Sequence, residues 1–85
     1  MPDTSTPTPR AVRARLTRAR GQIDAVIRLL DEGRPCEDVL AQLGAADRAL
    51  RAAGVVLLGG ALRECVTAHD ELRAARLERL FTVMS

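Results

Sequence analysis

The sequence of 85 residues contains no tryptophan and no tyrosine, and Phe81 is its only aromatic residue. The apolar fraction of 47% therefore consists almost entirely of small aliphatic side chains. A short chain buries a smaller share of its surface than a larger domain, so this single small domain has a limited core. We expect self-association to supply the burial that one chain lacks.

Long apolar runs are absent as well. No stretch approaches the roughly 18 apolar residues of a membrane span, and the N-terminus lacks the charged and then apolar layout of a signal peptide. These absences predict a cytoplasmic protein with no membrane contact. Thiols are mostly reduced in the cytoplasm, where a cysteine pair is more often redox-sensing, metal-binding or catalytic than structural.

Lysine is also missing, so all 13 basic residues are arginine, although the formal net charge is only +2. Arginine has a planar fork of donors that suits phosphates and the guanine edge, so this bias permits nucleic-acid binding. A GC-rich genome explains the same bias equally well. No glycine-rich phosphate loop or strand-like alternation is visible, and we expect a protein that is not an enzyme.

Apolar residues recur at helical spacing through most of the chain, which predicts an all-α fold. Residues 1–9 hold three of the four prolines and are predicted to form a disordered arm, followed by one helical domain over residues 10–85. The first helix is predicted from about Pro9 to Asp31, and Gly33 then supplies a stop signal.

A second long helix is predicted from Pro35, as its first helical residue, to about residue 68. Gly59 and Gly60 are its weakest point, since glycine costs roughly 1 kcal/mol against alanine in a helix interior. We interpret these small residues as places where another helix approaches closely. The last segment, about 70–84, is predicted to be a short third helix or an extension of the second.

Two cysteines, Cys36 and Cys65, lie 29 positions apart on the predicted second helix. An unbroken helix separates them by roughly 43 Å, whereas a disulfide tolerates a Cα separation of about 7 Å. Thiols that act together must therefore meet between two chains. In an antiparallel two-fold dimer that joins Cys36 to Cys65, Val39 faces Leu62 and Leu50 lies near the axis, so the same register joins apolar residues.

Each cysteine is alternatively no more than a small buried hydrophobic residue. Against this, Cys36 lies in the first turn of its helix beside Arg34, a setting that favours the reactive thiolate. Glu37 and Asp38 act in the opposite direction. We interpret the pair as a functional, inter-chain thiol site.

The first predicted helix carries arginines and no acid in its first half. On a helical wheel they avoid the arc of Val12, Leu16 and Ile23, so they reach solvent. Such a surface suits DNA phosphates, although a solvated polar face without a partner has the same pattern. No helix-turn-helix, zinc finger or basic zipper is visible, so readout would rest partly on DNA shape and backbone. The arginines are Arg10, Arg13, Arg15, Arg18 and Arg20, joined by Arg48 and Arg51 from the second helix.

Several runs between residues 10 and 70 resemble the copper-sensitive operon repressor family. They are Arg20-Gly21-Gln22-Ile23-Asp24, Cys36, Asp38-Val39-Leu40, Gln42-Leu43 and Cys65. The resemblance implies a bacterial repressor of three helices whose antiparallel dimers pair into flat tetramers. It also implies binding to operator DNA until an inducer occupies the thiols, with Arg15 as a DNA contact and Arg18, Arg48 and Arg51 as weaker candidates.

The inducer depends on a departure from the family pattern. Copper-sensing members hold Cu(I) with two cysteines and a histidine one turn before the second, where this chain has Ala61, and Pro35 replaces their usual tyrosine. Two cysteines without that histidine are similar to the persulfide-sensing branch, whose thiols are joined across chains by added sulfur. In that branch Cys36 would attack and Cys65 would resolve. This interpretation requires no metal or cofactor.

Other functions remain open. A Cu(I) sensor would use Cys36, Cys65 and His69, which lies one turn after Cys65. The formaldehyde-sensing branch uses an N-terminal proline, here Pro2, but has a histidine near position 61 and no second cysteine. A different class would be a thiol-bearing helical interaction protein, or a small sulfur carrier, without a DNA partner.

Overall fold

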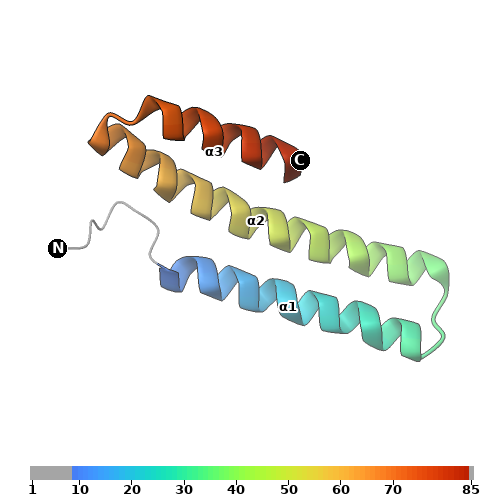
Figure 1. Ribbon diagram of the computed structural model, residues 1–85. Helices are drawn as coiled ribbons and strands as arrows, with labels where there is room; N and C mark the ends of the chain where they lie inside the picture. The colour runs from blue at the N-terminus through green and yellow to red at the C-terminus, as the bar shows by residue number, and fades with distance from the viewer. Residues whose placement is uncertain (1–8, 85) are drawn as a thin grey trace.

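The structure is a computed structural model that describes residues 9–84, which form three α-helices and no strand. These are α1 (Pro9–Asp31), α2 (Cys36–Ala68) and α3 (Glu71–Met84), shown in Figure 1. The predicted all-α class is confirmed. Of the predicted disordered arm, Pro9 begins α1 and residues 1–8 lie outside the described residues. The last segment is a separate helix rather than an extension of α2.

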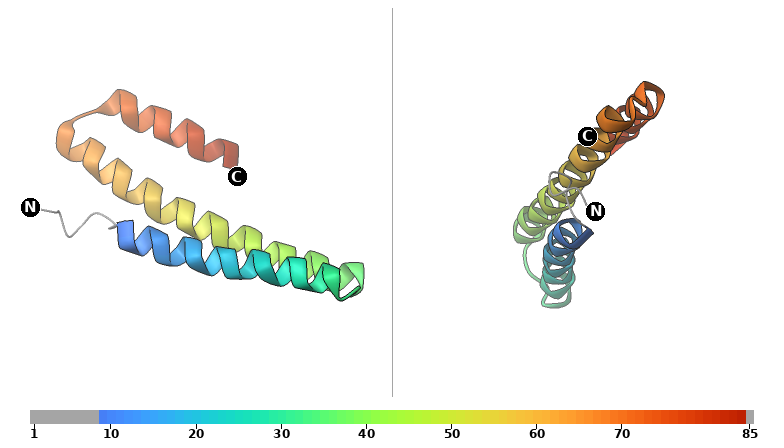
Figure 2. Two further views of the ribbon diagram at one scale, coloured as in Figure 1. Left: turned by 60° about the horizontal axis from the view of Figure 1, so that its bottom comes forward. Right: turned by 90° about the vertical axis from the view of Figure 1, so that its left-hand side faces the viewer.

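The central helix is α2, and both other helices contact it without contacting each other. α1 runs antiparallel along its first part, and α3 folds back along its later part (Figures 1 and 2). The Cα atoms span 52 × 26 × 12 Å, so the chain is long and flat. A flat arrangement leaves the broad faces of the helices without a neighbour from the same chain.

Gly33 ends α1 as the sequence predicts. Its φ of 66° lies in the left-handed region, and its N–H donates to the Leu30 carbonyl at 3.1 Å. The Arg34 N–H donates to the Leu29 carbonyl at 3.0 Å, which completes a Schellman motif. Pro35, with ψ of 148°, caps α2 rather than beginning it. The predicted start is therefore wrong by one residue, because this extended ψ leaves Pro35 outside the helix and Cys36 first within it.

The turn between α2 and α3 repeats the Schellman motif without a glycine. His69 takes the left-handed conformation, with φ of 56°, and its N–H donates to the Val66 carbonyl at 3.2 Å. The Asp70 N–H donates to the Cys65 carbonyl at 2.9 Å. Asp70 then caps α3, since its Oδ1 accepts the Arg73 N–H at 3.0 Å. These bonds end α2 and reverse the chain.

The core consists of small residues. Ala19 and Val26 from α1 and Ala46 and Ala53 from α2 are buried, and each pair is spaced by seven residues on one helix face. α2 runs without interruption through Gly59 and Gly60, and Gly60 is buried. Close approach of another helix fits Gly60, which is buried, and Gly54, where α3 lies against the backbone, whereas no atom of this chain lies within 4 Å of a Cβ added at Gly59.

Large aliphatic side chains, by contrast, remain widely exposed, and no large side chain is fully buried among residues 9–84. An apolar surface of this extent is typical of a protein–protein contact. The exposed residues are Leu16, Ile23, Ile27, Leu30, Leu40, Leu43, Leu50, Val55, Leu57, Val66, Leu72, Leu80, Val83 and Met84.

Candidate functional site

The two cysteines occupy opposite ends of α2. Cys36 is the first residue of the helix and is exposed, whereas Cys65 lies in its last turn and is only 3% exposed. Both thiols are free. Since α2 is unbroken, the helical rise separates the two residues by roughly 43 Å. Within one chain the thiols cannot meet, so any joint action needs a second chain.

Cys36 is next to an ion pair. The Arg34 guanidinium donates to the Asp38 carboxylate at 2.8 Å, with the two side chains 51% and 43% exposed. Such an exposed pair contributes about 0–1 kcal/mol. The arginine that the sequence places beside Cys36 is therefore held by a carboxylate, while the thiol stays open to solvent.

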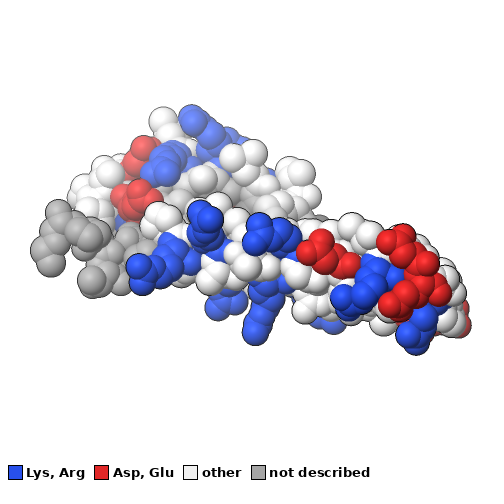
Figure 3. All heavy atoms as spheres, turned by 90° about the horizontal axis from the view of Figure 1, so that it is seen from below, with Lys and Arg blue, Asp and Glu red and all other residues white. Residues whose placement is uncertain are grey.

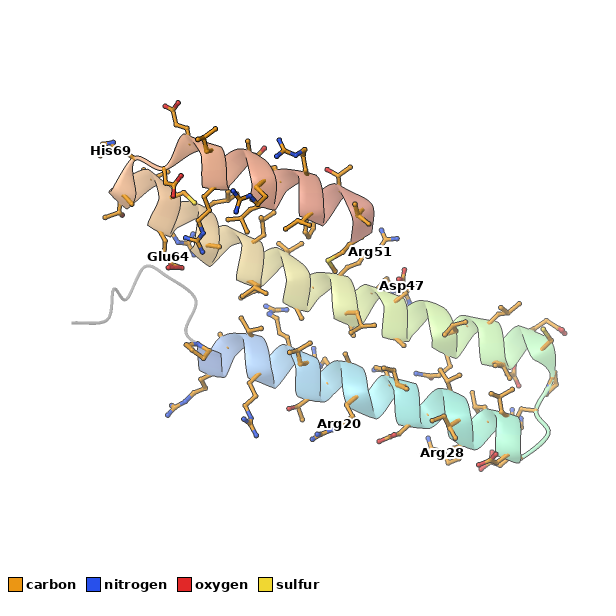
Figure 4. The ribbon with its side chains drawn as sticks, in the orientation of Figure 1. Arg20, Arg28, Asp47, Arg51, Glu64 and His69 are labelled. Atoms are coloured by element: carbon orange, nitrogen blue, oxygen red, sulfur yellow. The ribbon has the colours of Figure 1, made fainter. Side chains whose placement is uncertain are left out.

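Cys65 lines a pocket of about 230 Å³ between the end of α2 and the start of α3. The other lining residues are Val66, His69, Asp70, Glu71 and Ala74. Although His69 lines this pocket, it lies outside α2, so it does not share the helix face of Cys65 that the sequence predicts. Figure 4 shows His69 at the outer end of the corner between α2 and α3.

A metal site is not complete within the described chain. Among residues 9–84, no three His, Cys, Asp or Glu side chains lie close enough together to hold a metal ion. Ala61, half-buried on α2 one turn before Cys65, offers no ligand atom. Any metal bound by these cysteines would need ligands from two chains.

An arginine groove lies between α1 and α2. This groove has a volume of about 360 Å³ and is lined by Arg15, Arg18 and Arg48, together with Gln22, Ala45, Ala49 and Ala52. Arg15 and Arg18 also line a second hollow of about 380 Å³ with Ala11 and Ala14. The structure therefore brings three of the predicted DNA-contacting arginines, from two helices, to one place above small alanines.

Two glutamines connect the walls of the arginine groove. The Gln42 side-chain amide donates to the Gln22 carbonyl oxygen, and this hydrogen bond is partly buried between α1 and α2. The sequence does not single out this pair, although Gln22 and Gln42 both belong to the runs that carry the family resemblance. Because antiparallel helices bring these two positions opposite each other, a predicted hairpin register would have found the pair.

The remaining predicted arginines lie on other faces. Arg51 forms an ion pair with Asp47 at 3.4 Å, and Figure 4 shows both on the edge of α2 away from α1. Arg10, Arg13 and Arg20 are exposed on α1 and do not line the groove. Figure 3 shows basic side chains along the first part of α1 and acidic side chains mixed with basic ones toward the α1–α2 turn. The charge of this face is therefore graded along its length.

None of the three helices between residues 9 and 84 is both long enough and apolar enough to cross a membrane. No solved structure matches the chain at a significant level.

A comparison with protein families matches residues 8–85 to the family described as metal-sensitive transcriptional repressor. The copper-sensing transcriptional repressor RicR of Mycobacterium tuberculosis is 42% identical over 53 residues, which cover 62% of this chain and 55% of RicR. The copper-sensing transcriptional repressor CsoR of Mycobacterium ulcerans is 41% identical over 59 residues, covering 69% of this chain and 50% of CsoR.

A third similar protein, from Serratia marcescens, is described only as an uncharacterized protein in the bioA 5′ region. It is 35% identical over 74 residues, which cover 84% of this chain and 81% of that protein. The chain thus spans about half the length of the two named repressors and most of the length of the third.

Proposed function

Because this chain belongs to the family of metal-sensitive transcriptional repressors, we propose that it binds operator DNA and releases it when an inducer occupies Cys36 and Cys65. The observation that carries this proposal is the placement of one exposed and one buried thiol at opposite ends of a single helix. Two antiparallel chains would then form two equivalent sites, each with Cys36 of one subunit and Cys65 of the other.

The exposed apolar residues of α2 support the dimer that an inter-chain thiol site needs. Leu43 and Leu50 on α2 are 51% and 41% exposed in the single chain. The register that joins Cys36 to Cys65 places Leu43 opposite Leu58 of the partner subunit and Leu50 near the two-fold axis. We extend the proposal to a homotetramer, because the exposed aliphatic residues continue onto α1 and α3.

The arginine groove is the proposed DNA contact. Arg15, Arg18 and Arg48 would bind backbone phosphates, and the alanine floor lets a phosphate approach closely. Arg15→Ala should weaken operator binding by roughly tenfold and lower the slope of log affinity against log salt by about 1. Arg51→Ala is the matched control, because it removes an arginine of the same helix pair that does not line the groove. Equal losses for both variants in a salt-dependent mobility-shift titration would contradict the groove assignment.

The names of the relatives favour Cu(I) as the inducer, ahead of the reactive sulfur that the sequence pattern favours. RicR and CsoR are both described as copper-sensing. Cu(I) is a soft ion that binds thiolates well, and Cys36 with Cys65 of the partner subunit would supply two of them. His69 is the only imidazole of the chain and lines the Cys65 pocket, so it is the available third ligand.

Reactive sulfur is the second candidate, favoured by Ala61. Without an imidazole one turn before Cys65, the site is a pair of thiols better suited to sulfur chemistry. The Cys36 thiolate would attack a polysulfide, keep two added sulfur atoms as a hydrotrisulfide and release the shortened polysulfide. The Cys65 thiolate of the partner subunit would then attack the first added sulfur, releasing hydrosulfide and leaving the two chains joined through one added sulfur. The formaldehyde alternative depends on Pro2, which lies outside the described residues.

One experiment compares these inducers directly. The reduced protein is bound to an operator fragment and treated in parallel with Cu(I) and with polysulfide, and both DNA release and intact mass are measured. Release by Cu(I) without a change in mass would support the copper assignment. Release by polysulfide with a covalent dimer would support the sulfur assignment. Failure to bind any DNA fragment would instead favour an interaction protein or sulfur carrier, and would contradict the repressor proposal.

A further inference from the structure

Cys65 lies beside the start of α3. Gly54, Ala61 and Cys65 are spaced by seven and four residues, so they share one face of α2. At Gly54 this face meets the end of α3, since a Cβ there would lie 3.0 Å from Met84 Cε and 3.5 Å from Phe81 Cε1. At Cys65 it meets the start of α3, whose residues line the same pocket. α3 therefore lies along the face that contains the thiol.

α3 packs on α2 through residues that are no more than half-buried, among them Ala74, Leu77 and Phe81. No residue of α3 is buried, and Leu72 and Val83 are 82% and 85% exposed. At Gly54 its nearest atoms are the flexible end of Met84 and the edge of Phe81. Elements with few buried apolar contacts open at a free energy well below that of global unfolding. α3 is the element of this chain that fits that description.

Only His69 and Asp70 separate α2 from α3. His69 adopts a left-handed conformation that residues other than glycine rarely adopt. The Asp70 N–H donates a hydrogen bond to the backbone carbonyl of Cys65. The cap of α3, from Asp70 Oδ1 to the Arg73 N–H, lies wholly on the far side of this turn. A change of backbone angles at His69 would therefore move α3 as one body and leave its cap intact.

We propose that α3 is a lid that opens about His69 and controls access to the Cys65 thiol. With the lid closed, Cys65 is protected while Cys36 is open to solvent. A regulatory consequence rests on the function proposed above. Because α3 lies beside Cys65, movement of α3 would favour the approach of Cys36 of the partner subunit, so occupation of the inter-chain site and displacement of α3 are coupled.

The lid is tested by alkylation of the full-length protein with N-ethylmaleimide, followed by mass spectrometry. The Cys36→Ser variant reports Cys65 alone, and the Cys65→Ser variant reports Cys36 alone. We expect Cys65 to react at least about tenfold more slowly than Cys36, because it reacts only from the open state. Equal rates, or protection of Cys65 that disappears when the protein is diluted, would overturn the proposal, since dilution removes a partner subunit but not α3.

A matched pair of glycine substitutions tests whether contact with α3 protects Cys65 from alkylation. In the Cys36→Ser background, Gly54→Leu fills the place of Met84 and Phe81 and should raise the alkylation rate of Cys65 by about fivefold or more. Gly59→Leu is the control on the same helix, because nothing lies within 4 Å of a Cβ added there. An unchanged Cys65 rate in a folded Gly54→Leu protein, or the same increase in the control, would overturn the proposal.

A second measurement needs only the Cys36→Ser protein. Small additions of urea should accelerate Cys65 alkylation with a slope far shallower than that of global unfolding, because opening of α3 exposes little surface. A slope equal to that of global unfolding would show that no separate lid exists. Neither measurement involves DNA or an inducer, so the lid and the proposed function can fail independently.

Discussion

The two ends of α2 have the same local design and opposite consequences for their cysteines. Each end adjoins a Schellman motif with a left-handed residue, Gly33 before α2 and His69 after it. At the first end the chain leaves Cys36 exposed, while at the second it folds α3 back over Cys65. The exposure of each thiol therefore depends on the direction of the neighbouring helix, α1 or α3, and not on α2, which carries both cysteines. In a symmetric dimer, each site would then combine one open and one protected thiol.

Among the changes that test this difference between the two ends of α2, removal of either thiol should have the largest effect. Cys36→Ser and Cys65→Ser should each retain operator binding but lose inducer-driven release completely, because each proposed site needs one cysteine from either end. Mobility-shift titrations with and without inducer measure this. Mixed dimers that carry Cys36→Ser on one chain and Cys65→Ser on the other keep one intact site and serve as the control. Release by either single variant alone would show that the two ends do not act together.

The chemistry of the Cys65 end should change when an imidazole is added. Ala61→His places a ligand one turn before Cys65 and should tighten Cu(I) binding at least about tenfold, equivalent to about 1.4 kcal/mol. Competition with a chromogenic Cu(I) chelator measures the affinity. Ala75→His, on an exposed position of α3, is the control for added histidine. No gain over that control would mean that position 61 does not face the cysteine pair.

Substitution of the left-handed glycine should destabilise the Cys36 end. Gly33→Ala forces a side chain into φ of 66° and should lower the free energy of unfolding by about 1 kcal/mol. Urea denaturation monitored by circular dichroism measures the loss. Gly21→Ala is the control, because a Cβ there meets no atom within 4 Å and the residue lies inside α1. It should be neutral or stabilising, and equal losses in the two variants would contradict the strain assigned to Gly33.

The opposite substitution at the other end should have the smallest effect. His69→Gly relieves the same backbone conformation, with φ of 56°, and should raise the free energy of unfolding by about 0.5–1 kcal/mol. The same denaturation experiment measures it. His69→Ala is the control, since it removes the imidazole and keeps the strained backbone. A gain in both variants would trace the effect to the ring and not to the turn.

Spacing in the sequence predicts α1 and α2 almost to the residue, because one face of each helix repeats small or apolar side chains. It places the start of α2 one residue early, since a proline suits both the cap and the first helical position. The sequence does not decide whether α3 is separate from α2, because the turn depends on a left-handed histidine and only glycine marks such turns reliably. The contact of Met84 with Gly54 joins distant parts of the chain, so no local sequence pattern predicts it.

The candidate sites, like the helices, have one part that the sequence predicts and another that depends on how the helices pack. The residues themselves, Cys36, Cys65 and the arginines, were evident from residue type and spacing. Their grouping was not, because the arginine groove depends on how α1 and α2 are aligned. That alignment selects Arg15, Arg18 and Arg48 and leaves Arg51 with Asp47. The burial of Cys65 likewise depends on α3, whose direction the sequence did not fix.

The flat shape of the chain, only 12 Å across its thinnest dimension, would make protein concentration a variable of the proposed repressor. A layer this thin has little interior of its own, so the copies bound in the proposed assembly would add stability that follows mass action. Dilution would separate those copies and so remove the inter-chain thiol site, while leaving the contacts within each chain. A cell that holds this protein near its assembly constant would therefore switch repression sharply with small changes in its abundance.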